Sequence, residues 1–356
     1  MSSGGAPLAA RVHAQLSAGG FVSGADLAHR LGVSRNAIWK SVVALRALGL
    51  EVHAVRNRGY RLPIPCEPLD AAAIRAALAV EVRRRIRRLE TVWTVESTNA
   101  ALLTRTDLPA GLADVFAAEY QTAGRGRLGR AWLAPPGGAI CLSIGWSFPQ
   151  LPRDLAALGL AIGVCALRAL RGSVPEEPRA APGGLRSGEA AAGLRRLSLK
   201  WPNDLTIGDR KLGGILIEMR AESAGPTYVV IGIGVNLALG ARLAEQVAAT
   251  GTLAVDLAST GAEPGRRNAI IAALCGELIG GLTRFQQDGL RPFADEWAAA
   301  DSLRDRAVSA RTGEQTLRGI ARGIDASGAL LVETPQGLQK LLSGDVTVRP
   351  AEERIE

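Results

Sequence analysis

The segment QTAGRGRLGRAWLAPPGG, at 121–138, constrains the fold of this chain more than any other feature. It follows a predicted strand and has the G-x-G-x-x-G spacing of dinucleotide-binding folds. In those folds the glycine turn leads directly into a helix, whose N-terminus binds the pyrophosphate. Here the chain continues into Pro-Pro-Gly-Gly at 135–138, which excludes a stable helix. The glycine spacing therefore does not indicate a dinucleotide site.

The same segment carries three arginines, Arg125, Arg127 and Arg130. Guanidinium groups present planar donor pairs that match carboxylate and phosphate groups. The glycines allow the backbone to approach a ligand closely. We therefore expect a loop that becomes ordered around an anion; the alternative is a surface turn with incidental arginines.

The central region alternates predicted strands and helices. Strands are expected at 91–95, 113–120 and 139–146, and in the segments LSLKW, KLGGILIEM and YVVIGIGVNL. Helices are expected at 70–88, from ESTNAALL onward, and at 154–171, 265–287 and 290–300. The arginines between 83 and 88 are interpreted as a solvated face. Because strands outnumber the helices between them, we predict a mixed α+β sheet rather than a doubly wound one.

The first 65 residues are typical of a winged helix-turn-helix domain. Two predicted helices are joined by a turn at Gly32, and Ser34 can cap the second helix. A basic hairpin around RNRG follows, in the position of a wing. The alternative is a small helical domain with a solvated basic face. The residues expected to contact DNA are Ser34, Arg35, Asn36, Trp39, Lys40 and Arg58.

Composition narrows the function further. The formal net charge of +8 suits a phosphate-rich partner. No signal peptide is recognised, and no uninterrupted apolar run reaches the ~20 residues of a membrane span. The four scattered cysteines indicate buried thiols in a reducing cytoplasm, with no zinc site. The three histidines all lie within the first 53 residues. His-containing triads and His-ligated metals are therefore excluded from the rest of the chain.

These patterns divide the chain into three predicted domains. Residues 1–65 form the winged helix-turn-helix and residues 66–300 the larger body. Within the body, residues 172–193 are rich in Pro, Gly and Ala and are predicted to be a flexible insertion. In residues 301–356, short strands separated by RTGE, DASG and PQG indicate a small β-barrel.

Five motifs occur in the order ESTN, EYQTAGRGRLGRAW, KWPNDL, RKLGGILIE and VVIGIGVNL. Behind a winged helix, they resemble the bifunctional bacterial family of biotin–protein ligases and biotin-operon repressors. The resemblance implies a class II synthetase-like catalytic domain and an SH3-like C-terminal barrel. It implies an enzyme that uses ATP and Mg²⁺ to make biotinyl-5′-AMP, and then transfers biotin to a lysine of the biotin carboxyl carrier protein of acetyl-CoA carboxylase. Operator DNA and homodimerisation through the catalytic sheet are implied as well, and no membrane partner.

The resemblance also implies roles for individual residues. Its biotin-binding residues are Ser97, Thr98, Asn99, Gln121, Arg125, Gly126, Arg127 and Lys200. Its residues for ATP or the adenylate are Arg127, Arg130, Trp132, Lys211 and Asn236. Arg125, Arg127 and Lys200 are implied to be catalytic. Leu128 stands where some relatives have another basic residue, which removes one expected phosphate contact.

The implied chemistry agrees with the absence of histidine beyond residue 53. The carboxylate of biotin is already ionised at neutral pH and needs no general base to attack the α-phosphate of ATP. Two alternatives stay open at this point. One is a biotin-responsive transcription factor without ligase turnover, against which the intact Lys200 and GRGR loop argue. The other is an acyl ligase for lipoate.

Overall fold

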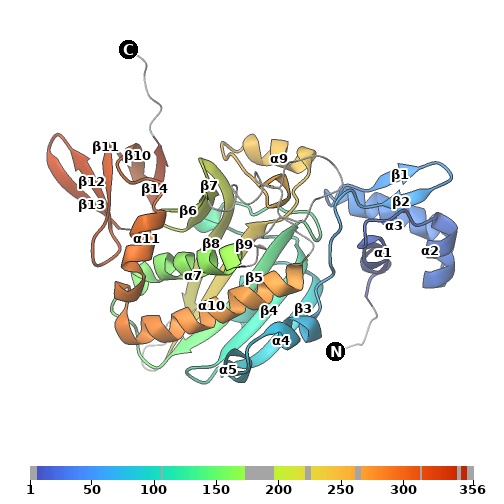
Figure 1. Ribbon diagram of the computed structural model, residues 1–356, viewed down its shortest axis with the longest axis horizontal. Helices are drawn as coiled ribbons and strands as arrows, with labels where there is room; N and C mark the ends of the chain where they lie inside the picture. Colours follow the sequence, from blue (N-terminus) through green and yellow to red (C-terminus); the bar gives the residue numbers. More distant parts are fainter. Residues whose placement is uncertain are drawn as a thin grey trace, which may run out of the picture.

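The computed structural model describes residues 6–105, 107–172, 196–220, 226–260, 266–312, 315–342 and 346–350. Figure 1 shows a small N-terminal domain, a central sheet with its helices and a C-terminal sheet, arranged along the long axis. The insertion predicted at 172–193 lies outside the described residues, apart from Gly172.

The N-terminal domain consists of three helices and a hairpin. Its elements are α1 (Leu8–Leu16), α2 (Gly24–Leu31), α3 (Arg35–Ala47), β1 (His53–Val55) and β2 (Gly59–Arg61). Ser23 and Ser34 cap α2 and α3, each through a side-chain oxygen that accepts a backbone N–H three residues on. Gly32 ends α2 with a φ of 66°. The predicted helix-turn-helix and its hairpin are confirmed.

The central sheet has seven strands in the order β3-β4-β5-β9-β8-β7-β6. The strands are β3 (Ile86–Val95), β4 (Ala113–Gln121), β5 (Ala139–Phe148), β6 (Leu197–Lys200), β7 (Asp204–Ile207), β8 (Arg210–Arg220) and β9 (Thr227–Asn236). β3 and β4 run parallel, whereas the other neighbouring pairs are antiparallel. The predicted mixed sheet is therefore confirmed.

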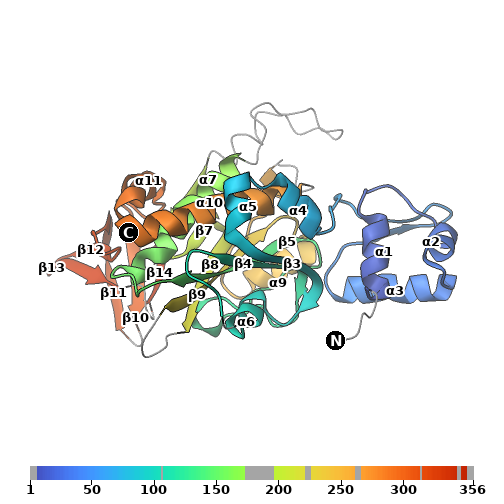
Figure 2. The ribbon, with the colours of Figure 1, turned by 90° about the horizontal axis from the view of Figure 1, so that it is seen from below.

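Helices lie on both faces of this sheet. α7 (Leu158–Gly172) and α10 (Arg267–Asp288) pack together on one face, and α6 (Thr98–Leu103) lies on the other (Figure 2). The other helices are α4 (Ala71–Ala77), α5 (Val80–Arg85), α9 (Ala241–Ala248) and α11 (Ala294–Ala300). The 3₁₀ turns are η1 (Arg127–Gly129), η2 (Leu155–Ala157), η3 (Ala258–Thr260) and η4 (Arg291–Phe293).

Two helical segments, Leu155–Gly172 and Arg267–Asp288, are long and apolar enough to cross a membrane by length and composition. Charged residues, such as Arg168 and Glu277, interrupt both segments, so neither is an uninterrupted apolar run. In the structure 67% and 61% of their most apolar windows are buried. Their side chains belong to the main hydrophobic core, which accounts for their apolar character.

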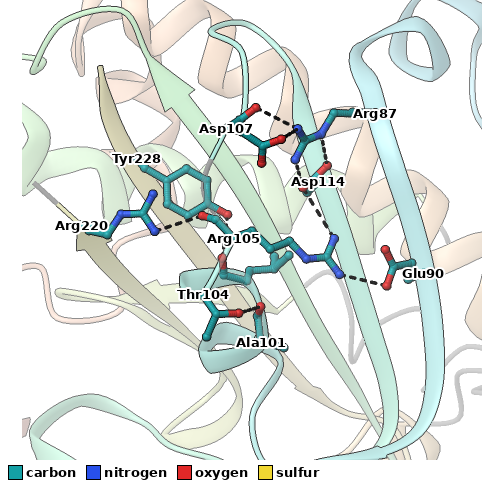
Figure 3. A network of polar contacts seen from close by, with 10 residues as sticks. Arg87, Glu90, Ala101, Thr104, Arg105, Asp107, Asp114, Arg220 and Tyr228 are labelled. Atoms are coloured by element: carbon teal, nitrogen blue, oxygen red, sulfur yellow. Dashed lines mark hydrogen bonds and ion pairs between the residues drawn. The ribbon is translucent and has the colours of Figure 1, made fainter. Parts of the chain in front are cut away.

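The helix predicted over 70–88 is wrong at its C-terminal end. α5 ends at Arg85 and β3 begins at Ile86. The solvated face predicted for the arginines is also wrong for Arg87, whose Nε and Nη2 donate to the fully buried carboxylate of Asp114 at 3.0 and 2.6 Å (Figure 3). The pairing joins β3 to β4. The run of arginines was interpreted as solvated because the buried partner of Arg87 lies 27 residues further along the chain.

The C-terminal strands are β10 (Ala307–Thr312), β11 (Gln315–Ile324), β12 (Leu330–Thr334), β13 (Gly337–Leu341) and β14 (Val346–Pro350). They form one antiparallel sheet in the order β13-β12-β11-β10-β14. The predicted barrel is corrected: among the described residues, β13 and β14 are the two edges and do not pair with each other. Alternating strands and turns predict consecutive hairpins, whereas closure depends on edge pairing that no local pattern specifies.

Asp301 links α11 to the C-terminal sheet and titrates unusually. Its Oδ1 accepts from the Leu303 N–H at 2.9 Å, whereas Oδ2 is buried without a hydrogen-bond partner. Burial raises the pKa of this carboxyl to about 6. Between the unfolded value of 3.8 and about 6, the folded state therefore binds more protons than the unfolded state, and stability falls as the pH rises through this window.

We therefore expect Asp301→Asn to raise the free energy of unfolding near neutral pH, where the parent carboxylate is ionised and buried. Near pH ~4 most of this difference is expected to disappear, because the Asp301 carboxyl of the folded state is then protonated. Urea unfolding at the two pH values measures the effect. An equal difference at both values would rule out titration of Asp301 as the cause.

Candidate functional site

The N-terminal end of α6 is joined to the C-terminal end of β4. Ser97 caps α6 through its Oγ, which accepts from the Ala100 N–H at 3.3 Å. The backbone N–H and the hydroxyl of Thr98 both donate to Gln121 Oε1, at 2.8 and 3.0 Å. Ser97 and Thr98 are almost completely buried, whereas Gln121 is half-buried. Predicted residues 23 positions apart thus form one hydrogen-bonded group.

Ser143 extends this group across the sheet. Its hydroxyl lies 2.7 Å from Thr98 Oγ1 and 2.6 Å from Asn99 Oδ1. We call Thr98, Asn99, Gln121 and Ser143 the polar floor. Ser143, which is fully buried in β5, was not among the predicted site residues. The one signal was a hydroxyl inside the apolar strand AICLSIGW.

Asn99 also connects to Glu218, a second residue that the sequence analysis missed. Its Nδ2 donates to Glu218 Oε2 at 2.7 Å and lies 3.3 Å from the Leu216 carbonyl. Gly232 leaves the space for this amide, because a Cβ there would lie 2.4 Å from Asn99 Oδ1. Glu218 stands in the quoted motif RKLGGILIE, so its position was visible but its partner was not.

The segment 122–132 between β4 and β5, which we call the arginine-rich loop, folds back on itself. Gly126 N–H donates to the Arg130 carbonyl at 2.7 Å, and Trp132 N–H donates to the Gly124 carbonyl at 2.8 Å. Leu128 has a φ of 56°, in the left-handed region. The loop contains only the turn η1 and no α-helix follows it before β5, as the proline and glycine residues predicted.

Two of the loop arginines reach towards the neighbouring strands. Arg125 Nη2 lies 4.0 Å from Glu218 Oε1, and Arg127 Nη1 donates to Asn203 Oδ1 at 3.2 Å. Asn203 in turn donates to the Ile215 carbonyl at 2.6 Å. Arg130 is exposed near the end of the loop. Asn203, the asparagine of KWPND, is a third residue that the sequence analysis did not single out.

Trp132 leaves the loop and lies against the sheet. Its ring is half-buried over the backbone of β9, where a Cβ on Gly234 would come within 2.5 Å of the indole. Only glycine at 234 leaves room for the ring in this position. An aromatic face at the edge of the polar site can stack on a planar base.

Two predicted nucleotide residues, Lys211 and Asn236, lie on β8 and β9, and the predicted biotin residue Lys200 lies on β6. Lys200 at the end of β6 is paired in register with Asp204 at the start of β7. Lys211 Nζ donates to Asp204 Oδ1 at 2.5 Å. Asn236 Nδ2 donates to the Val255 carbonyl at 3.1 Å and lies 3.4 Å from the Lys211 carbonyl. The KWPND turn is thus an ion-paired turn as well as a candidate binding element.

Trp201 has a structural function beside this turn. Its side chain is 1% exposed and its Nε1 donates to the Gly328 carbonyl at 3.1 Å. The peptide bond to Pro202 is cis. The KWPND motif, which contains Lys200, is therefore hydrogen-bonded to the C-terminal domain. This contact was not predicted from the sequence.

The sheet registers explain why these segments meet. Ala139 at the start of β5 pairs with Asn236 at the end of β9, and Val235 pairs with Gly213 near the start of β8. Ala118 near the end of β4 pairs with Cys141. The end of β4, the start of β5, the end of β9 and the start of β8 consequently share one end of the sheet, with the polar floor on the α6 side.

All four cysteines are buried and free. Burial raises the pKa of Cys141 to about 11 and the pKa values of Cys165 and Cys275 to about 12. It raises the pKa of Cys66 as well. The thiols therefore remain protonated at neutral pH, and the prediction that they are small buried hydrophobes is confirmed.

The residues expected to contact DNA are all exposed. Ser34 caps α3, and the exposed residues Arg35, Asn36, Trp39 and Lys40 follow on its first turns. Arg58 is also exposed, in the turn between β1 and β2, where its Cζ lies 4.2 Å from the centre of the Phe21 ring.

A buried ion pair of the central domain lies close to His13 of the winged domain. Arg267 on α10 and Glu119 on β4 join through Nη1 and Oε2 at 2.5 Å, and Arg267 also donates to the Glu67 carbonyl at 2.9 Å. Cys66 lies 3.5 Å from the same guanidinium. Burial lowers the pKa of nearby His13, whose ring centre lies 5.4 Å from that of Trp93 of β3, with the two rings tilted by 54°. Glu119 precedes Gln121 by two residues, so this junction adjoins the site.

Three sequence families match the chain, one in each unit. The Biotin/lipoate A/B protein ligase family matches residues 94–236. A helix-turn-helix domain family matches residues 9–61, and the Biotin protein ligase C terminal domain matches residues 305–349. The first match contains the polar floor and the arginine-rich loop.

Known proteins resemble the chain over most of its length. The Bifunctional ligase/repressor BirA of Salmonella typhimurium is 36% identical over 95% of this chain and 96% of its own. The Biotin--[acetyl-CoA-carboxylase] ligase of Mycobacterium tuberculosis is 33% identical over 78% of this chain and 95% of its own. A biotin protein ligase of Aquifex aeolicus, solved with biotin and ATP, has a TM-score of 0.55 at 22% identity over 75% of this chain and 100% of its own. This last similarity is one of fold.

Proposed function

Because the chain belongs to the family of bifunctional biotin ligases and repressors, we propose that it activates biotin with ATP and transfers it to a carrier lysine. The product of the first step is biotinyl-5′-AMP. The acceptor is the biotin carboxyl carrier protein of acetyl-CoA carboxylase, the enzyme for which relatives are named. With the adenylate bound, the N-terminal domain represses biotin-biosynthesis genes.

The observation that carries this proposal is the polar floor lying beside the arginine-rich loop. The ureido ring of biotin contains both donors and an acceptor, and buried hydroxyl and amide groups can satisfy all of them. Ser97 and Gly126 border this floor and loop. The valerate carboxylate and the phosphates are anions, for which Arg125, Arg127 and Lys200 supply positive charge.

The chemistry requires placement and neutralisation of charge more than proton transfer. The carboxylate oxygen attacks the α-phosphate, a new C–O–P linkage forms and pyrophosphate leaves. Arg127 and Lys200 offset the repulsion between the carboxylate and the triphosphate. In the second step the carrier amine attacks the acyl carbon and AMP leaves. Until that step, Arg125 and Arg127 exclude water from the anhydride.

The nucleotide lies over β8 and β9 in this proposal. The adenine stacks by Trp132, and Arg130, Lys211 and Asn236 lie near the phosphates. Among the residues that the structure describes, no group of three or more His, Cys, Asp or Glu could hold a metal ion. Mg²⁺ commonly keeps several waters and binds through substrate phosphates, so it would enter with ATP and neutralise them.

A ligation assay tests the proposal. The full chain is mixed with ATP, Mg²⁺, biotin and a biotin-carrier domain, and biotin on the carrier lysine is measured. Labelling in molar excess over the protein is expected and would exclude a transcription factor without turnover. If lipoate rather than biotin drives the release of pyrophosphate, the protein is a lipoate ligase. No labelling at all would overturn the proposal.

DNA binding is tested separately with the promoter of the biotin genes. Asn36→Ala is expected to weaken the mobility shift by about tenfold or more, because an amide that contacts a base edge contributes roughly 1–3 kcal/mol of discrimination. Ligation by this variant should match the parent, since the Asn36 side chain is exposed on α3 of the winged domain. An unchanged shift would remove Asn36 from the interface.

Cytoplasmic localisation and homodimerisation through the central sheet complete the proposal. Buried free thiols suit a reducing compartment. Dimerisation after the adenylate forms would couple ligand to operator, because a two-fold operator requires two winged domains. Sedimentation with and without biotin and ATP tests this.

A further inference from the structure

We propose that Tyr228 and Arg220 are positioning residues for the ligand site. They hold the C-terminal end of α6, and thereby set Thr98 and Asn99 at its other end into the polar floor. The inference rests on the proposed function only for the identity of the ligand. The arrangement that carries it is drawn in Figure 3.

α6 has six residues, and a helix this short is not stable without tertiary contacts. The carbonyl groups of its last turn also need hydrogen-bond donors. Tyr228 Oη donates to the Leu102 carbonyl at 3.1 Å. Arg220 Nη1 donates to the carbonyls of Leu103 and Arg105, each at 3.0 Å. A cation at this end also interacts favourably with the helix dipole.

The phenol of Tyr228 is fixed in place by its surroundings. The side chain is 5% exposed and packs in a small cluster that includes Leu102. A Cβ on Gly145 would lie 2.3 Å from the phenol oxygen, so the ring crosses β5 only where glycine permits it. Arg220 Cζ lies 5.2 Å from the ring centre. Burial raises the pKa of Tyr228 to about 12, which keeps the donating proton at neutral pH.

The chain just after α6 is fixed to the sheet as well. Arg105 Nη2 donates to Glu90 Oε2 at 2.9 Å, and Nη1 lies 3.6 Å from Asp114 Oδ2. Arg87 binds the same Asp114 and donates to the Asp107 carbonyl at 2.9 Å. β3, β4, β8 and β9 thus all contribute to holding one end of α6.

The opposite end of α6 makes the contacts of the site. Thr98 and Asn99 lie within 2.6–3.0 Å of Gln121, Ser143 and Glu218. The helix is only about 9 Å long at 1.5 Å per residue, so a tilt at one end displaces the other. Hydrogen bonds weaken steeply with displacement and misalignment. Release of the C-terminal end would therefore misplace the polar floor.

The test uses the full chain with Tyr228→Phe, Arg220→Gln and the double variant. We expect the biotin KM of the double variant to rise about tenfold, with kcat within about twofold of the parent, because several hydrogen bonds that position the site are weakened. Hydrogen exchange should be faster at the backbone amides of Thr98 and Ala100. Arg220→Lys, which keeps a donor and a charge, should have a biotin KM between those of the parent and of Arg220→Gln.

Arg168→Gln is the matched control. It breaks a part-exposed pair with Glu296 among the helices on the other face, and is expected to leave both KM and exchange unchanged. Parent-like KM and exchange in the double variant, or an equal KM rise in the control, would overturn the positioning role. If the double variant does not fold, Tyr228→Phe decides alone, because it removes only a hydroxyl. If the parent fails to ligate, the proposed function fails, while exchange still tests the anchoring of α6.

Discussion

Arg127→Ala is expected to reduce carrier biotinylation by about 10- to 100-fold and to increase the release of free biotinyl-5′-AMP. A hydrogen bond to a charged group contributes about 1.5–3 kcal/mol, and Arg127 is proposed to contact both the biotin carboxylate and the phosphate. The reason lies in where the structure holds this side chain. Arg127 is half-buried and bound to Asn203, which is itself bonded to β8. The guanidinium is therefore held between the loop and the sheet before a ligand arrives.

Two quantities need to be measured for this variant. One is biotin on the carrier over time; the other is adenylate found free in solution when no carrier is present. Arg153→Ala, an exposed arginine in another loop, is the control and should behave as the parent does. If Arg127→Ala ligates slowly but retains its adenylate, Arg127 acts in the chemical step and does not close over the intermediate.

Arg267→Met is expected to lower the free energy of unfolding by about 3–5 kcal/mol, the usual cost of leaving one member of a buried ion pair alone. The guanidinium is fully buried. Without it Glu119, which also accepts from the Leu69 N–H at 2.6 Å, would keep a buried charge with no cation beside it. The Glu67 carbonyl would lose its donor as well.

Urea unfolding followed by tryptophan fluorescence measures this loss. The double variant Arg267→Met/Glu119→Leu should regain much of it, because no buried charge then remains. Arg322→Met, at an exposed ion pair of the C-terminal sheet, is the control and should leave the free energy of unfolding close to that of the parent. Loss of the same size in the single and double variants would indicate that packing, rather than charge, is the important term.

The same junction lies directly beside the arginine-rich loop. Gly137 packs against Cys66 and His13, and its N–H donates to the Glu119 carbonyl at 3.1 Å. Glu119 and Gly137 flank the arginine-rich loop on its two sides. The segment that follows the arginine-rich loop therefore also touches His13 of the winged domain.

Local sequence patterns predicted much of the fold. Ser23, Gly32 and Ser34 mark the ends of helices because capping depends on a few neighbouring residues. Pro135 and the residues after it excluded a helix for an equally local reason. The boundary at Arg85 was missed, because a helical pattern and a strand starting at Ile86 overlap in the same run of side chains.

The candidate site was predictable only in part. Ser97, Thr98, Asn99 and Gln121 were selected through their motifs, and the structure brings them together. Ser143 was missed because a single hydroxyl in an apolar strand has no periodic signature. The pairing of Arg87 with Asp114 was missed because strand order, rather than local sequence, makes β3 and β4 neighbours.

The sequence by itself determined the local conformations, the mixed class of the sheet and the identity of the charged loop. Each depends on residues within a few positions of one another, or on motif order, both of which are present in the linear chain. Only the tertiary structure decided which distant groups share hydrogen bonds: Asn99 with Glu218, Arg127 with Asn203, and Tyr228 with the end of α6. These contacts follow from strand order and register, which bring together residues up to 126 positions apart. That long-range pairing builds the polar floor and places the arginine-rich loop beside it.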